Sequence, residues 1–198
     1  VEPRVLYLGS AFLTSFPKDG GGGEYADRPA FDHLRALGVT HVIAMLDDAD
    51  AYYAEDGYLR YWSEQTGHEI TTTWIEIDPS DPFARNDRGG LRAAGMVVAI
   101  VRERDGRGAV YMHDTEGIAH VGVAAAGYEL WRNRGWQDPE VSWRQVERRY
   151  LAANETMAEA AAAGRAAPQA GCGDGTRAYV CVDPLRRIRR ELLFVIEL

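Results

Sequence analysis

The sequence predicts an α/β protein with a central, mostly parallel β-sheet flanked by helices and followed by a C-terminal extension. Short apolar or β-branched runs alternate along the chain with longer segments in which apolar residues recur at helical spacing. This alternation is typical of β-α-β units, whose strands lie parallel. At 198 residues, 46% of them hydrophobic, the chain can bury a substantial core.

Strands and helices are expected in a regular order. Four segments have the character of strands, and they are residues 4–10, 39–46, 69–77 and 109–112. Helical patterns cover residues 29–37, 91–104, 121–131 and 143–163. The first helix has Pro29 in its first turn and Gly38 just past its end, which are favoured places for these residue types.

The end of the chain differs in composition from the rest. Residues 164–175 form a Gly/Ala/Pro linker, 176–182 suggest a short strand and 184–198 an amphipathic helix with an arginine-rich face. We therefore expect one domain over residues 1–163 and an extension over 164–198. Its helix is expected to dock on the core, although it could instead cover the site or mediate self-association.

Three segments carry no firm expectation of an element. Residues 17–25, with four consecutive glycines, are expected to be an exposed connector. The aromatic-rich region 52–62 either packs on the core or lines a pocket. Asp47, Asp48 and Asp50 directly follow a predicted strand, where they are either solvated loop residues or groups that meet a cation.

Charge and composition exclude several classes of function. A formal charge of −8 argues against a general nucleic-acid binder and favours neutral or cationic partners. No run approaches the roughly 18 apolar residues of a membrane span, and no secretory signal is visible. We therefore expect a soluble, cytoplasmic protein, in which Cys172 and Cys181 are free thiols.

The most informative segment is 110–122, which reads V-Y-M-H-D-T-E-G-I-A-H-V-G. An apolar strand ends at His113, a polar loop containing Gly117 follows, and a helical pattern begins at Val121. Main-chain N–H groups converge at such a helix N-terminus and favour an anion there. The segment therefore predicts an amide cradle, meaning a loop whose main-chain N–H groups point at a ligand.

This segment resembles the signature loop of the cysteine-dependent protein tyrosine and dual-specificity phosphatases. Their pattern is His-Cys, five residues, Arg, then Ser or Thr; His113 matches its histidine, Gly117 its mid-loop glycine and Gly122 the glycine after the loop. The phrases Leu-Tyr-Leu-Gly-Ser at 6–10 and Leu-Gly-Val-Thr-His-Val-Ile at 37–43 also resemble this family.

The resemblance spans about residues 4–135 and implies a dual-specificity-phosphatase-like fold. It also implies a binding loop composed of His113, Thr115, Glu116, Gly117, Ile118, Ala119, Val121 and Gly122 around Asp114 and His120. In the family the histidine corresponding to His113 supports the loop from beneath. His41, within the second phrase, is expected to be a structural histidine with satisfied hydrogen bonds.

All three chemical positions of the family pattern are replaced in this chain. Asp114 stands in place of the nucleophilic cysteine, His120 in place of the phosphate-binding arginine, and Val121 in place of the hydroxyl residue. Thiol chemistry and bidentate phosphate binding are therefore lost. A carboxylate in the amide cradle favours its ionised form and repels a phosphate dianion. We expect no phosphatase activity.

One further acid is implied by the resemblance. In the family, the strand comparable to 69–77 leads to an aspartate that protonates the leaving group, and Asp78 and Asp81 are both candidates here. Each is also a plausible turn-forming residue beside Pro79 and Pro82.

Two functions remain open at this stage. The first is a small-molecule enzyme in which Asp114 is a base or electrostatic anchor and His120 its acid partner, with Asp78 or Asp81 beside them. An acidic lining suits an amine or guanidine, and eliminations, cyclisations and isomerisations all fit. The alternative is a pseudophosphatase that acts as a catalytically inactive binding or scaffold module. No cofactor and no metal are expected.

Overall fold

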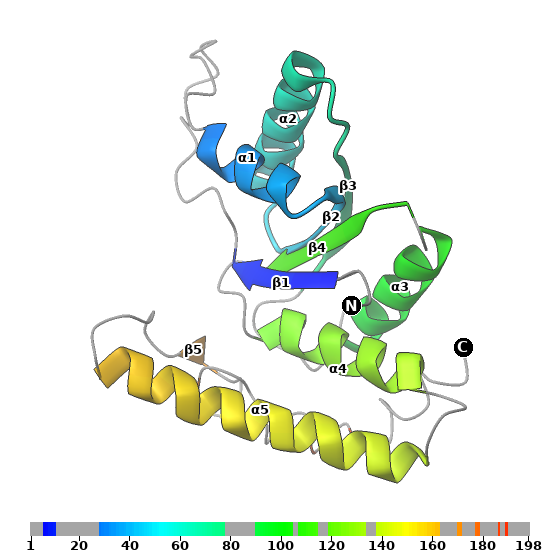
Figure 1. Cartoon of the computed structure of the whole chain (residues 1–198), viewed down its shortest axis with the longest axis vertical. Coiled ribbons are helices and arrows are strands. Elements are labelled where there is room, and N and C mark those ends of the chain that lie inside the picture. The colour runs from blue at the N-terminus through cyan, green and yellow to red at the C-terminus, as the bar shows by residue number, and fades with distance from the viewer. Residues whose placement is uncertain are drawn as a thin grey trace.

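The computed structural model describes residues 6–10, 28–77, 90–104, 107–114, 119–133, 138–162, 170–171 and 177–178, together with Arg186 and Arg189. In chain order the elements are β1 (Leu6–Ser10), α1 (Arg28–Ala36), β2 (Val39–Leu46), α2 (Ala49–Thr66), β3 (Thr71–Glu76), α3 (Gly90–Glu103), β4 (Ala109–Asp114), α4 (Ala119–Asn133), α5 (Pro139–Ala162), β5 (Ala170–Gly171) and β6 (Arg177–Ala178) (Figure 1).

The main sheet has four strands in the order β1-β4-β2-β3, and all three pairings are parallel. This confirms the α/β class, with a sheet that is entirely rather than mostly parallel over the described residues. Asp114, the last residue of β4, is level with Ser10 of β1 and Met45 of β2. The three strands therefore end together, and their carboxyl ends form one edge where such sheets place ligands.

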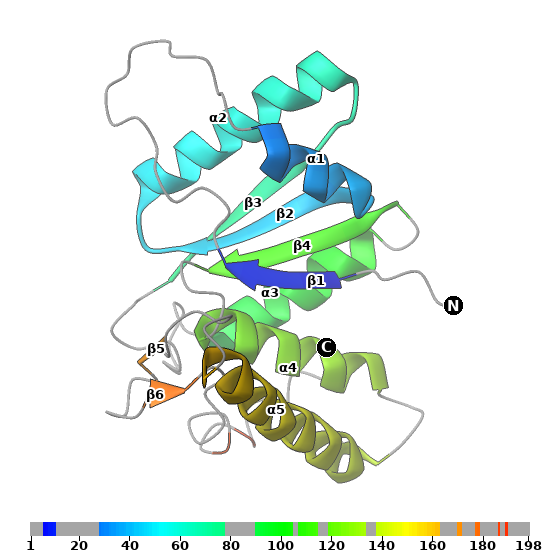
Figure 2. The ribbon, with the colours of Figure 1, turned by 60° about the vertical axis from the view of Figure 1, so that its left-hand side comes forward.

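Helices cover both faces of this sheet (Figure 2). On one face α1 and α2 pack on β2 and β4 around a core that includes Phe31 and Tyr58. On the other face α3 and α4 pack on a second core that includes Ile43 and Met112. Helix α5 packs on α4 rather than on the sheet, so it forms an additional outer layer (Figure 1).

The predicted helical stripes are the buried ones. Phe31 and Leu34 of α1 are buried, and so are Ala94, Val97, Val98 and Val101 of α3. Gly38 ends the first helix with φ +72°, a left-handed conformation that glycine adopts without a Cβ clash. Periodicity therefore located these helices correctly because their apolar faces are the faces that meet the sheet.

Gly108 precedes β4 and is required for a close approach. Its φ is +107°, and a Cβ there would lie 2.5 Å from the Thr40 side chain. Thr40 also donates a hydrogen bond from Oγ1 to the Arg107 carbonyl at 2.8 Å. The turn before β4 is thus held against β2, which fixes the start of the strand that carries the predicted site.

The aromatic-rich region, to which the sequence assigned no element, is part of helix α2. The Asp48 side chain caps this helix by accepting from the Asp50 N–H at 2.9 Å, and Gly67 ends it at φ +68°. Of the aromatics, Tyr58 is only 2% exposed, whereas Tyr53 is 63% exposed. The region therefore both packs on the core and reaches the surface.

Other element boundaries differ from the sequence-based expectations. Helix α4 begins at Ala119, two residues before Val121. Helix α5 begins at Pro139 rather than near residue 143, because Asp138 accepts from the Glu140 N–H at 2.8 Å and caps the helix. The expected linker 164–175 contains β5, which pairs antiparallel with β6.

Several expectations concern residues outside the described ranges. These are the glycine-rich connector 17–25, Cys172, Cys181 and most of the C-terminal segment 184–198. Two arginines of that segment are described: Arg186 lies 2.5 Å from a Glu147 carboxylate oxygen, and Arg189 pairs with Glu140. Both acids belong to α5, so these two arginines contact this helix.

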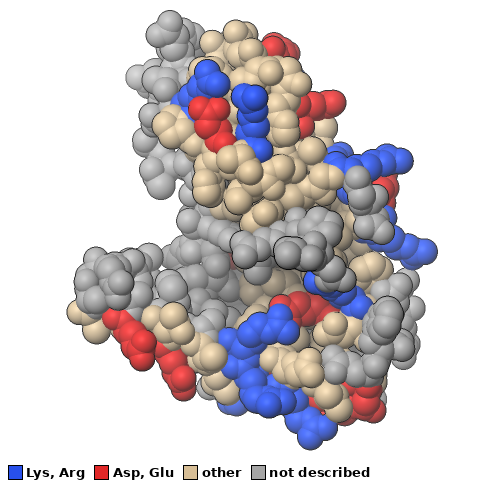
Figure 3. Space-filling model, in the orientation of Figure 1, with Lys and Arg blue, Asp and Glu red and all other residues tan. Residues whose placement is uncertain are grey.

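Basic side chains concentrate around α5. Figure 3 shows arginine atoms gathered over the region where α5 lies, with Asp and Glu atoms beside them. Exposed Arg144, Arg148 and Arg149 belong to this helix, and Arg149 pairs with Glu129 of α4 at 2.7 Å. Over the described residues, no helix has the combination of length and apolar character that crossing a bilayer requires.

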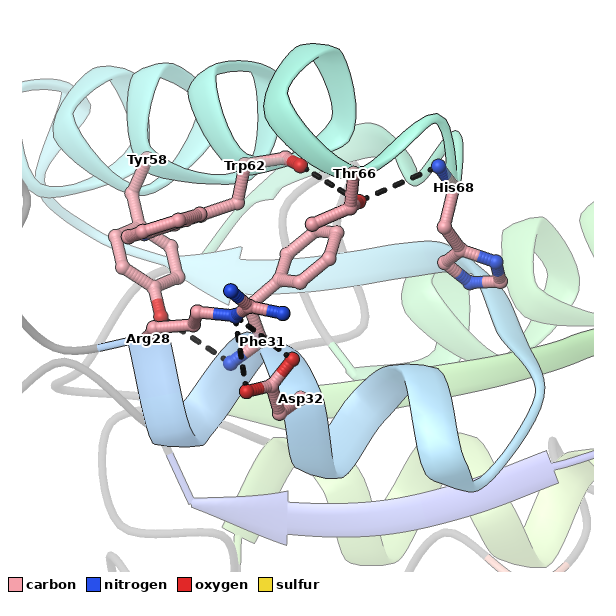
Figure 4. Close-up of polar contacts among 7 residues, drawn as sticks. All are labelled: Arg28, Phe31, Asp32, Tyr58, Trp62, Thr66 and His68. Carbon is pink, nitrogen blue, oxygen red and sulfur yellow. Dashed lines mark hydrogen bonds and ion pairs between the residues drawn. The ribbon is translucent and has the colours of Figure 1, made fainter.

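Helices α1 and α2 are joined by polar contacts over their apolar interface (Figure 4). Phe31 is the fourth residue of α1, and its N–H donates to Tyr58 Oη at 3.1 Å, in a buried position. Arg28 lies over the Trp62 ring, 5.4 Å from its centroid, and pairs with Asp32. Tyr58 is therefore both a core side chain and a hydrogen-bond acceptor for α1.

We expect Tyr58→Phe to lower the free energy of unfolding by about 1–2 kcal/mol, because it removes a buried hydrogen bond between α2 and α1. The matched control is Tyr53→Phe on the same helix, where the exposed ring should change stability by less than about 0.5 kcal/mol. Urea denaturation of the three proteins measures both. Equal stabilities for the two variants would contradict a stabilising hydrogen bond between Tyr58 and Phe31.

Candidate functional site

Asp114 lies at the N-terminus of α4, as the strand-loop-helix pattern predicted. Its carboxylate Oδ2 accepts a hydrogen bond from the Val121 N–H at 3.2 Å. Val121 is the third residue of α4, so this N–H is one of the four that the helix itself leaves unpaired. Asp114 is only 3% exposed. A carboxylate thus occupies the position where the helix dipole favours an anion.

The side chain of His113 contacts helix α2. Its Nε2 is 2.8 Å from Oε1 of Glu55, and the two side chains are almost completely buried, at 0% and 2% exposure. With the carboxylate ionised, Nε2 carries the proton and donates it to this hydrogen bond. The contact joins the end of β4 to α2, residues that are 58 positions apart in the chain.

The charge of Glu55 acts on a second residue of β4. Burial, and to a smaller extent the Glu55 carboxylate, raise the pKa of Tyr111 to about 12. The Tyr111 and His113 rings lie 5.7 Å apart. Tyr111 is therefore a neutral phenol at physiological pH and adds no charge near the site.

The start of α4 is also held from the outside by α5. Tyr150 Oη donates to the Gly122 carbonyl at 2.7 Å. Burial is the main reason that the pKa of Tyr150 lies well above its ordinary value, so the hydroxyl keeps its proton. The first turn of α4 is thus fixed by Asp114 on one side and by Tyr150 on the other.

The structure leaves part of the predicted site outside the described residues. Residues 115–118, which include Thr115, Glu116, Gly117 and Ile118, lie there, as do Asp78 and Asp81. Ala119 and His120 are placed as the first two residues of α4, but their side chains are not described. The structure therefore brings together Asp114, His113 and the amide of Val121.

The edge of the sheet next to Asp114 is acidic. Strand β2, whose Met45 is level with Asp114, ends at Leu46, and the exposed Asp47, Asp48 and Asp50 follow it. Of these, Asp48 caps α2. Three carboxylates thus surround the end of the strand that neighbours β4 and give this edge a negative potential.

His41 is a structural histidine, as expected. It is 4% exposed, and its ring nitrogens lie 2.7 Å from Thr71 Oγ1 and 2.9 Å from Thr73 Oγ1. Burial, assisted by the nearby charge of Arg104, lowers the pKa of His41 to about 4. It is therefore neutral near pH 7, between two hydroxyl groups of β3.

Glu55 is the residue of this site that sequence reasoning did not identify. Placed on a helix, Glu55 shares a stripe with Tyr58, Leu59 and Trp62, at spacings of three, four and seven residues. An acid on an apolar stripe signals a buried carboxylate that needs a partner. That signal depends on recognising residues 49–66 as a helix.

Among the residues that the structure describes, no group of three or more His, Cys, Asp or Glu side chains is arranged to hold a metal ion. No protein-family model matches the chain, and no curated protein sequence matches it.

Proposed function

We propose that this protein has a dual-specificity-phosphatase-like fold whose former phosphate loop now performs acid–base chemistry on a small cationic molecule. The observation that carries this proposal is the Asp114 carboxylate on the Val121 N–H, 3.2 Å away, at the N-terminus of α4. The parallel sheet supports the fold assignment, since β4 lies at its centre and leads through the loop into α4.

The position of Asp114 argues against a phosphate ester as ligand. A phosphoryl group in this cradle would need the amide that the carboxylate already uses, and it would approach a second negative charge in a buried environment. At about 4 Å and an effective dielectric constant of about 20, two unit charges interact by roughly 4 kcal/mol. That repulsion is larger than the gain from a single charged hydrogen bond.

The surroundings favour a cation. The exposed Asp47, Asp48 and Asp50 lie at the same edge of the sheet as Asp114. A bound amine or guanidine would be attracted by this edge and would place its charge near the Asp114 carboxylate. In the proposed reaction Asp114 is the base or electrostatic anchor, His120 is its acid partner, and Asp78 or Asp81 contributes a further carboxyl group.

A scaffold without catalysis is the second candidate, and one observation favours it. Because Asp114 is 97% buried and caps α4, its carboxylate already has a structural role. A protein that lost its nucleophile and used aspartate to stabilise the loop would show this arrangement. Binding measurements on Asp114 variants distinguish the two.

We expect small amines and guanidines to bind the wild-type protein and to shift the NMR amide signals of Val121 and Gly122. Replacing Asp114 by asparagine should weaken that binding by about tenfold or more, because a charged partner is lost. Inorganic phosphate should show the opposite order and bind Asp114→Asn more tightly than the wild type. Ethanolamine, methylguanidine and agmatine are suitable probes.

The control for this experiment is Asp47→Asn, which removes the same charge from an exposed position at the same edge. It should change the affinity for each probe by no more than about threefold. A wild-type protein that binds none of the cations, with an Asp114→Asn variant that is equally inert, would favour the scaffold. Hydrolysis of an aryl phosphate by Asp114→Asn and the wild type alike would contradict both candidates.

A further inference from the structure

A second candidate binding feature lies away from Asp114, along helix α2. It is a surface groove of about 810 Å³ between one stripe of α2 and the chain around the start of β3. The helix contributes a stripe that runs its whole length and contains Tyr52, Asp56, Arg60, Ser63 and the C-capping Gly67. Residues 69–72 form the opposite side. We call this feature the α2–β3 groove.

The α2–β3 groove has the length of an extended peptide. From Tyr52 to Gly67 the helix rises through fifteen residues, about 22 Å at roughly 1.5 Å per residue. A β-strand of about seven residues spans that distance at roughly 3.3 Å per residue. A small molecule would leave most of the stripe uncovered, whereas an extended chain would contact it throughout.

The strand beside the groove has main-chain groups available for pairing. Over the described residues β3 is a terminal strand of the sheet. The Ile77 N–H donates to Leu46 of β2 at 3.3 Å, and alternate residues of a strand direct their main-chain groups to opposite sides. Thr72 and Trp74 therefore direct theirs away from β2. Figure 2 shows β3 and α2 together at this end of the sheet.

The charges of the groove define the kind of peptide. Asp56 is paired with Arg60 at 2.5 Å, and its other oxygen accepts from Thr72 Oγ1. Glu64 and Glu69 are exposed and, among the described residues, have no ion-pair partner. The groove is therefore negative overall and complementary to lysine or arginine side chains.

Aromatic rings lie at the end of the groove that is near the N-terminus of α2. Tyr52 stacks on Trp74 with ring centroids 5.4 Å apart, and Tyr53 lies beside both rings. Tyr53 is 63% exposed, the most exposed large apolar side chain among the described residues. Exposed tyrosines supply contact area for peptide side chains and attract cations to their faces.

We propose that the α2–β3 groove binds an extended, lysine- or arginine-rich segment of a partner protein, which joins the sheet as a strand next to β3. Main-chain hydrogen bonds to Thr72 and Trp74 would provide affinity, and Glu64 and Glu69 would select basic side chains. This is the recognition mode in which a peptide adds to an exposed sheet edge. It does not involve Asp114 and stands independently of the chemistry proposed there.

The test is selection from a displayed library of random nine-residue peptides, followed by affinity measurements on the synthetic winners. We expect enrichment of peptides in which Lys or Arg alternates with β-branched residues. Replacing both Glu64 and Glu69 by glutamine should weaken binding by about tenfold, roughly threefold per charge, and added salt should weaken it further. Asp114→Asn should bind as the wild type does.

Two variants at Thr72 separate strand pairing from side-chain contact. Thr72→Pro removes the outward N–H and should weaken binding by about tenfold, since proline is tolerated where an edge N–H faces solvent. Thr72→Val removes only the hydroxyl and should retain most of the affinity. If Thr72→Pro does not fold, charge reversal of Glu64 and Glu69 to lysine provides the decisive variant. Failure to enrich any peptide, or binders that tolerate all these changes, would overturn the proposal.

Discussion

Replacing Glu55 by alanine is expected to lower the free energy of unfolding by about 3–5 kcal/mol, because it leaves a buried hydrogen-bonding group unpaired and a cavity in place of the side chain. The Glu55 carboxylate and the His113 ring lie 2.8 Å apart and are both inaccessible to solvent. Removing the Glu55 carboxylate leaves the His113 ring without this hydrogen bond, in a position that water does not reach. Chemical denaturation monitored by circular dichroism measures the loss.

Three comparisons make this result specific. Glu55→Gln keeps an acceptor for His113 Nε2 and should recover a large part of the lost stability. Glu64→Ala, on the exposed side of the same helix, should cost less than about 0.5 kcal/mol. Combining Glu55→Leu with His113→Phe should be less damaging than Glu55→Ala alone, because both polar groups are removed together. A double variant that is as unstable as Glu55→Ala, or less stable, would contradict a coupled pair.

The same pair connects α2 to the candidate site. His113 is followed directly by Asp114, whose carboxylate caps α4. A change at Glu55 therefore acts on the residue next to the proposed base, at the point where β4 ends. We expect the Val121 amide signal to move in Glu55→Ala, and to move less in Glu55→Gln.

The strands and the sheet-packing helices could be predicted because local pattern and tertiary packing agree. The run 39–46 is apolar on both sides, and β2 is indeed covered by helices on both faces. The stripe of α3 is apolar at helical spacing and is buried against the sheet. For these elements a residue's neighbours in sequence already determine what it contacts.

Helix α2 was not predicted because the residue types in its sequence do not favour a helix. It contains Gly57 and a high density of aromatic residues, which favour helices less than Ala or Leu do. Tertiary contacts of Tyr58 and Leu59 and the cap at Asp48 stabilise the helix instead. With α2 unassigned, Glu55 could not be placed, and its pairing with His113 depends on a contact between distant parts of the chain.

The candidate site was predictable only at its centre. The loop pattern placed Asp114 at a helix N-terminus, because a strand ending at a polar residue, a glycine-containing loop and a helix are contiguous in the sequence. The His113 side chain contacts Glu55 of α2, and its expected position beneath the loop stays a prediction. The roles of His120, Asp78 and Asp81 stay predictions.

The second large effect concerns acid stability and follows from His41. The pKa of this histidine is about 4 in the folded protein and about 6.5 in an unfolded chain, because burial and the charge of Arg104 disfavour the protonated ring. Above pH 6.5 both states are neutral and His41 carries no penalty. As the pH falls from 6.5 to 4, the unfolded state binds a proton that the folded state does not, so unfolding is favoured.

We therefore expect the wild-type protein to lose up to about 1.4 kcal/mol per pH unit relative to a His41→Gln variant over this window, on the order of 2–3 kcal/mol in total. Glutamine keeps a donor and an acceptor for Thr71 and Thr73 but does not titrate. Urea unfolding at pH 7.5, 5.5 and 4.0 gives the stability of the wild type and of His41→Gln as a function of pH. The control is His33→Gln, at an exposed position of α1, whose stability should change with pH as that of the wild type does. If the stabilities of His41→Gln and the wild type also changed in parallel with pH, His41 would bind protons equally in the folded and unfolded states. That result would contradict a buried, neutral His41 ring between the two threonines.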